Sequence, residues 1–108
     1  MLPNRNFRKI LLSIKSKLCE KYKENIILKL TFEFALEVVK YSEDLDKKGK
    51  HVIAKQIIRS GTSVGANTKE AQNAESKKDF IHKLAIAQKE ANETDYWLEL
   101  LFQSDYLN

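Results

Sequence analysis

The sequence predicts an all-α protein of the up-and-down four-helix-bundle type. Its 108 residues are 43% hydrophobic and 31% charged, which is typical of one small globular domain. Pro3 is the only proline and lies at the N-terminus, so no proline interrupts a helix further along the chain. Apolar residues recur at helical spacing over most of the remaining sequence.

The first predicted helix carries an apolar stripe with basic residues around it. The stripe consists of Phe7, Ile10, Leu11, Ile14, Leu18 and Tyr22. A membrane-surface helix is the alternative, but the segment has no tryptophan and no broad apolar face, so packing on the domain is favoured. We expect residues 1–22 to form a basic helical extension of a bundle domain formed by residues 23–108, with residues 25–30 as a short connection.

The second predicted helix, from residue 31 to about residue 48, carries two apolar stripes. Phe32, Ala35, Leu36 and Val39 form one stripe, and Phe34, Val38, Tyr41 and Leu45 form the other. One stripe can face the core, whereas the other needs the first helix or another subunit as a neighbour. Gly49 can adopt the left-handed conformation that ends a helix.

The third predicted helix, from about residue 50 to residue 74, contains Gly61 and Gly65. A helical glycine costs about 1 kcal/mol relative to alanine, so close approach of another backbone is expected to compensate. A break in the helix is the alternative, while the spacing of a phosphate-binding glycine loop is absent. Arg59, Ser63 and Asn67 begin a polar stripe that ends at Glu70. A solvated or inter-subunit hydrogen-bonding face with intrahelical pairing is favoured over a ligand site there.

The fourth predicted helix begins at Ser76, whose side chain can cap it three residues before Asp79. Its core seam, with alanines suited to close contact with the glycine-containing helix, consists of Phe80, Leu84, Ala87, Ala91, Leu98 and Phe102. Ile86, Tyr96, Trp97 and Leu100 project away from this seam. We therefore predict an oligomer or partner interface, with core packing as the alternative, formed by Phe34, Val38, Ile86, Tyr96, Trp97 and Leu100.

Positive charge is concentrated at the N-terminus. Eight Lys or Arg residues and two Glu residues lie between Met1 and Lys29, while the rest of the chain is slightly acidic. This asymmetry indicates a polyanionic partner, although a solvated basic face is the alternative. The candidate nucleic-acid-binding residues are Arg5, Arg8, Lys9, Lys15, Lys17, Lys21 and Lys23, with Lys55, Arg59 and Lys69 as weaker candidates.

Signatures of catalysis or of a metal site are absent from the sequence. His51 and His82 have no second ligand at metal-site spacing, and Cys19 is the only cysteine. No nucleophile elbow or HExxH motif occurs. We therefore expect no catalytic residues, metal or cofactor. The chain has no export signal and no apolar run long enough to span a membrane, so we expect a cytoplasmic protein.

Several stretches resemble the four-helix-bundle proteins encoded in intervening sequences of bacterial large-subunit ribosomal RNA. They are residues 23–27 (KENII), 32–36 (FEFAL), 56–67 (QIIRSGTSVGAN), 76–87 (SKKDFIHKLAIA), 89–91 (KEA) and 93–98 (ETDYWL). The resemblance implies a bacterial, non-enzymatic bundle. A relative, the accessory protein of diversity-generating retroelements, forms a five-membered ring that binds nucleic acid and a reverse transcriptase, which by analogy suggests a pentamer here.

The chain departs from this family at both ends. Members tend to start near Lys23 and to continue past residues 104–107 into a further C-terminal helix, whereas this chain adds the basic N-terminal segment and stops at Asn108. The N-terminal helix is therefore expected to replace or supplement that C-terminal helix, with partners covering the apolar surface as the alternative.

Two functional hypotheses follow. The first is a self-associating bundle that binds structured RNA through phosphate contacts, without base-specific recognition. The second is a protein-interaction module that docks a partner such as a reverse transcriptase and has no direct nucleic-acid role.

Overall fold

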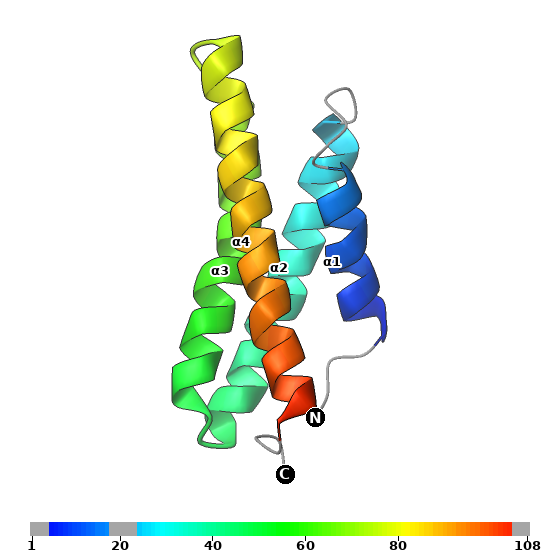
Figure 1. The fold of residues 1–108 in the computed structure, drawn as a ribbon, viewed down its shortest axis with the longest axis vertical. Helices are drawn as coiled ribbons and strands as arrows, with labels where there is room; N and C mark the ends of the chain where they lie inside the picture. The colour runs from blue at the N-terminus through cyan, green and yellow to red at the C-terminus, as the bar shows by residue number, and fades with distance from the viewer. Residues whose placement is uncertain (1–4, 18–23, 105–108) are drawn as a thin grey trace.

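The computed structural model consists of four α-helices and, over the part of the chain that it describes, no strand. It describes residues 5–17 and 24–104, with side chains for residues 9–15 and 26–104. The helices are α1 (Arg5–Lys17), α2 (Glu24–Lys47), α3 (His51–Ala71) and α4 (Lys77–Gln103). They run alternately up and down the long axis of the molecule (Figure 1). The predicted all-α, up-and-down bundle is therefore confirmed.

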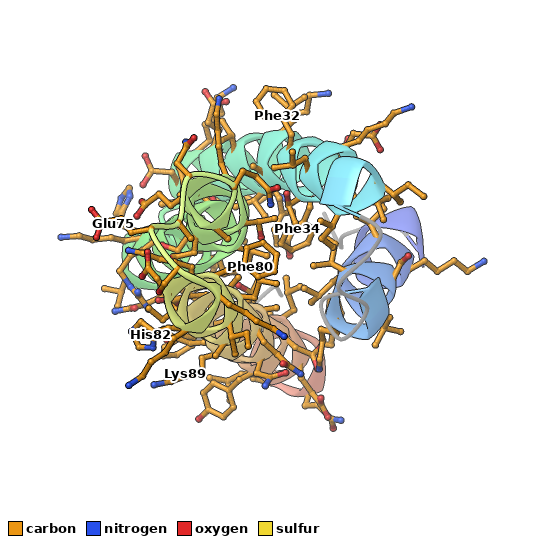
Figure 2. All side chains as sticks on the ribbon, turned by 90° about the horizontal axis from the view of Figure 1, so that it is seen from above. Phe32, Phe34, Glu75, Phe80, His82 and Lys89 are labelled. Carbon is orange, nitrogen blue, oxygen red and sulfur yellow. The ribbon has the colours of Figure 1, made fainter. Side chains whose placement is uncertain are left out.

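The four helices surround one core. α3 packs between α2 and α4 on one side, and α1 packs against α2 and α4 on the other. Seen from above, α2 and α4 lie diagonally opposite each other, with α1 and α3 closing the two remaining sides (Figure 2). The N-terminal helix thus occupies the fourth position of the bundle.

Local signals end α2 and begin α4 as the sequence predicts. Gly49 has a φ of 80°, which lets the chain turn so that the Lys50 N–H donates to the Leu45 carbonyl oxygen at 2.9 Å. At the start of α4, the Ser76 hydroxyl oxygen accepts a hydrogen bond from the Asp79 N–H at 3.0 Å. Both turns are therefore specified by one or two residues of suitable chemistry.

The predicted connection at residues 25–30 is wrong, because α2 already begins at Glu24. Ile27 and Thr31 are 5% and 1% exposed, and they lie seven and three residues before the fully buried Phe34. The buried face of α2 therefore continues through this segment at helical spacing. No glycine or proline lies there to stop the helix.

One of the two apolar stripes of α2 faces the core and the other is exposed. Phe34 and Val38 are fully buried in the core, so the prediction that these two side chains form an intersubunit or partner surface is corrected. Phe32 and Leu36, on the other stripe, are 65% and 48% exposed. Figure 2 shows Phe34 directed into the bundle and Phe32 directed away from it. Both stripes have helical period, so periodicity alone could not distinguish them.

α3 is one continuous helix through both glycines, and its close neighbour there is α2. A Cβ atom on Gly65 would lie 3.3 Å from the Thr31 carbonyl oxygen, and one on Gly61 would lie 2.6 Å from a methyl carbon of Val38. The predicted close approach to another backbone is therefore confirmed at Gly65. The helix ends at Ala71, three residues earlier than predicted, and residues 72–74 turn towards α4.

The predicted seam of α4 faces the core, and Leu84 and Phe102 pack against its fully buried members. Ala87, Ala91 and Leu98 are fully buried. α4 also joins α3 through a buried hydrogen bond of 2.9 Å between the hydroxyls of Thr94 and Ser60. The α3–α4 interface therefore combines small apolar residues with a satisfied polar pair.

Candidate functional site

α1 carries a concentrated positive charge. Its thirteen residues include five Lys or Arg and no acidic residue. Leu11 and Ile14 are fully buried, which holds the helix against α2 and α4, whereas Lys9 is exposed and has no ion pair among the described residues. The positively charged helix is therefore fixed against α2 and α4 by its buried apolar residues.

The remaining N-terminal candidates are only partly described. Arg5, Arg8 and Lys17 belong to α1, but their side chains lie outside the described part, and Lys21 and Lys23 lie outside the described residues altogether. Lys15 contacts α4, where its Nζ atom lies 3.3 Å from Oδ2 of Asp95. Their side chains are 27% and 21% exposed, so this ion pair is largely covered.

Arg59 of α3 is bound by two carboxylates of α4. Its guanidinium donates to Glu93 and, at 3.5 Å, to Glu90. The hydrogen bond to Glu93 is the main cause of a raised pKa for Arg59. The pKa of Glu93 is lowered by the hydrogen bond from the Trp97 indole N–H, at 3.2 Å, and by that from Arg59. Because its charge is already compensated, Arg59 is a poor phosphate ligand in this arrangement.

The two other weak candidates on α3 are exposed. Lys55 and Lys69 have no ion pair within the described part of the chain. They lie fourteen residues apart on a helix that rises about 1.5 Å per residue, so about 21 Å separates their backbones. They do not form one site.

The polar stripe of α3 is satisfied by contacts within the chain. The Ser63 hydroxyl donates to the Arg59 carbonyl oxygen at 2.7 Å, and the Asn67 amide donates to the Ser63 carbonyl oxygen at 2.9 Å. At the end of the stripe, Glu70 accepts a hydrogen bond from Lys83 of α4 at 3.2 Å. These contacts favour the hydrogen-bonding interpretation of this face over a ligand site.

An apolar groove lies between the start of α3 and the end of α4. It has a volume of about 400 Å³ and is lined by Val52, Ile53, Gln56, Trp97, Leu100 and Ser104. Val52 is 76% exposed, and Tyr96, which meets Trp97 edge-to-face at 5.2 Å, is 60% exposed. The predicted Tyr96, Trp97 and Leu100 therefore lie together, while Ile86 is half-buried further up α4. Val52, at the start of α3, lines the same groove and was not among the predicted residues.

A second apolar surface follows the outer side of α2. Phe32, Leu36 and Val39 are exposed on it. Beside Phe32 lies a groove of about 220 Å³ between α2 and α3, with Lys69 at its edge. This surface differs in shape and residues from the groove at Trp97. A signal for it was present in the sequence, because the stripe is apolar and the other stripe already supplies a core face.

The described residues offer no constellation for metal binding. No group of three or more His, Cys, Asp or Glu side chains in this part of the chain is arranged to hold a metal ion. His51 is exposed and its Nδ1 atom pairs with Asp46 in the turn between α2 and α3. None of the described helices is long and apolar enough to cross a membrane.

The geometry thus defines a small helical bundle that presents a basic helix and two apolar surfaces. The chain belongs to the family described as "23S rRNA-intervening sequence protein", whose sequence profile matches residues 23–108. This membership confirms the resemblance seen in the sequence. The match covers α2, α3 and α4, while α1 precedes it.

A solved structure is similar over most of its length. It is a protein with unknown function from the S23 ribosomal protein family of Bacteroides thetaiotaomicron, at 49% sequence identity and a TM-score of 0.75. The similarity covers 80% of this chain and 78% of that chain. Comparison with curated proteins finds no match.

Proposed function

We propose that this protein is a non-enzymatic RNA-binding bundle whose α1 helix contacts the phosphates of structured RNA. The supporting observation is that α1 carries five basic residues and no acidic residue while buried Leu11 and Ile14 hold it on the bundle. A helix of thirteen residues is about 20 Å long, so its basic residues can follow several successive phosphates. Membership of a family named for a ribosomal RNA insertion is consistent with such a ligand.

The chemistry of α1 favours recognition of shape and backbone. Lys and Arg neutralise phosphates and release counterions, so the affinity should fall steeply as salt rises, by a log–log slope of about 0.7 to 0.9 per phosphate contacted. The helix offers no aromatic side chain among residues 9–15 for base stacking. We therefore expect binding to depend little on base sequence.

Fluorescence anisotropy with a labelled structured fragment of ribosomal RNA, at 50 to 200 mM salt, tests this proposal. The variant Arg5→Gln/Arg8→Gln/Lys9→Gln should bind at least about tenfold more weakly and lower the salt slope by about two or three. The matched control is Lys77→Gln/Lys78→Gln/Lys89→Gln, which removes the same charge from exposed positions on α4. Equal losses in the two variants, or no binding at about 50 mM salt, would contradict the proposal.

Self-association is a second proposed property, supported by the two dissimilar apolar surfaces. Contact between the exposed Phe32 and Leu36 of one copy and the groove at Trp97 and Leu100 of the next would be head-to-tail. Such contacts form a ring when the rotation between successive copies closes, and an open filament when it does not. The family resemblance suggests a ring of five. A partner protein such as a reverse transcriptase is the alternative occupant of the groove.

Mixing two variants tests this arrangement by light scattering after size exclusion. Phe32→Glu and Leu100→Glu should each prevent assembly, yet their equimolar mixture should form a heterodimer through the one contact left intact in each pair. Ile81→Glu, which places the same charge at another exposed apolar position, is the control and should assemble normally. If the wild-type chain is monomeric, the alternative that a partner protein occupies the groove is supported. A pull-down that is insensitive to nuclease and is lost in Leu100→Glu would then identify this partner.

A further inference from the structure

One basic residue of the proposed RNA-binding helix, Lys15, already forms an ion pair with the bundle. Lys15 lies next to the fully buried Ile14, and its Nζ atom is 3.3 Å from Oδ2 of Asp95 on α4. About three quarters of each side chain is covered. Lys9 of the same helix is exposed and has no carboxylate partner among the described residues.

A phosphate that approaches Lys15 meets the negative charge of Asp95 at the same ammonium group. It must either share the ammonium with the carboxylate, at a cost in repulsion, or displace the carboxylate and leave Asp95 without this partner. Either route weakens phosphate binding relative to a lysine without such a neighbour. Asp95 therefore stands where it can compete with a phosphate.

We propose that Asp95 is an intramolecular competitor of phosphate for Lys15 and thereby limits the affinity of the α1 surface for RNA. This inference rests on the RNA-binding function proposed above and assigns a regulatory residue to that site. While Lys15 is paired with Asp95, α1 is held on α4. When a phosphate takes Lys15, this link is released, so RNA binding and the docking of α1 are coupled.

The experiment compares Asp95→Asn with the control Glu99→Gln on the same ribosomal RNA fragment. Glu99 lies one turn further along α4, is exposed and has no ion pair among the described residues, so its substitution changes the net charge equally. Asp95→Asn should bind about three- to fivefold more tightly at 100 mM salt, and Glu99→Gln less than twofold. The salt slope of Asp95→Asn should become steeper by about 0.7 to 0.9, as one more phosphate is neutralised.

A double-variant cycle assigns the effect to Lys15. Lys15→Gln alone should change the affinity little, because this lysine is engaged by Asp95, but it should abolish the gain in the Asp95→Asn background. Asp95→Ser removes the same charge with different packing and should reproduce the gain. Circular dichroism melts at one protein concentration verify that each variant is folded.

The possible outcomes separate the inference from the proposed function. Steep salt dependence in the wild-type protein, with equal affinities for Asp95→Asn and Glu99→Gln, overturns the role of Asp95 and leaves RNA binding standing. A gain in Asp95→Asn that persists with Lys15→Gln overturns the competition as well. If neither the wild-type protein nor Asp95→Asn binds at about 50 mM salt, both the inference and the proposed function fail.

Discussion

The substitution Gly61→Ala measures how closely α2 and α3 pack. A methyl group on Gly61 would lie 2.6 and 2.8 Å from the two methyl carbons of Val38, whose side chain is fully buried. Valine has few χ1 alternatives in a helix, so it cannot readily turn aside. Overpacking of this kind costs about 1–3 kcal/mol, while alanine gains about 1 kcal/mol over glycine in helix propensity. We therefore expect a net loss of about 0–2 kcal/mol.

Urea unfolding at one fixed protein concentration is the assay, since self-association would make stability depend on concentration. Ala66→Gly, at an exposed position of the same helix, measures the propensity term and should cost about 1 kcal/mol. In the Val38→Ala background both clashing methyl groups are gone and only the Cβ contact at 3.2 Å remains, so Gly61→Ala should become stabilising by up to about 1 kcal/mol. Equal stabilisation by Gly61→Ala in the wild-type protein and in the Val38→Ala variant would show that Val38 does not oppose a methyl group at position 61.

Three further predictions concern the core. Leu11→Ala should lower the free energy of unfolding by about 2–5 kcal/mol in a urea titration, whereas Leu12→Ala, at a 53% exposed position, should change it by about 0.5 kcal/mol or less. Thr94→Val removes the hydroxyl that bonds to Ser60 and should cost about 1 kcal/mol by thermal unfolding; no loss would show that this bond does not stabilise the fold. Burial raises the pKa of Tyr41 from 10.0 to about 12. The unfolded state therefore loses this proton first, and unfolding followed from pH 10 to 12 should show stability falling by up to about 1.4 kcal/mol per pH unit, a dependence that Tyr41→Phe should reduce.

Features governed by neighbours in sequence were predictable. Ser76 needs only the N–H of Asp79 to cap α4, and Gly49 needs only its own φ of 80° to end α2. The close approach at Gly65 could also be anticipated, because a glycine inside a helix requires compensation. Its partner was not predicted, since the sequence pointed to the alanines of α4, whereas the backbone that approaches Gly65 is that of α2.

Features governed by distant residues were not predictable. Arg59 has the chemistry of a phosphate ligand, but its carboxylate partners lie 31 and 34 residues away on α4. Likewise, Phe32 and Phe34 are two residues apart and chemically identical, and the packing of the other helices on α2 decides which one is buried. The sequence of a helix therefore shows that a charged residue or an apolar stripe needs a contact. The packing of the helices decides whether that contact is made within the chain or is left for a partner.

α1 is both part of the core and the proposed RNA-binding helix, which determines how its function can be tested. Deleting residues 1–22 would remove the most basic segment of the chain. It would also remove Leu11 and Ile14 from the core, together with the helix that packs against both α2 and α4. Loss of RNA binding after deletion would then have two causes that no binding assay separates. Substitutions that change charge and keep the apolar face, such as Lys9→Gln, would alter the proposed phosphate contacts and leave Leu11 and Ile14 in the core. If Lys9→Gln weakens binding without lowering the melting temperature, α1 contributes its charge directly; if both fall together, the helix acts through the fold.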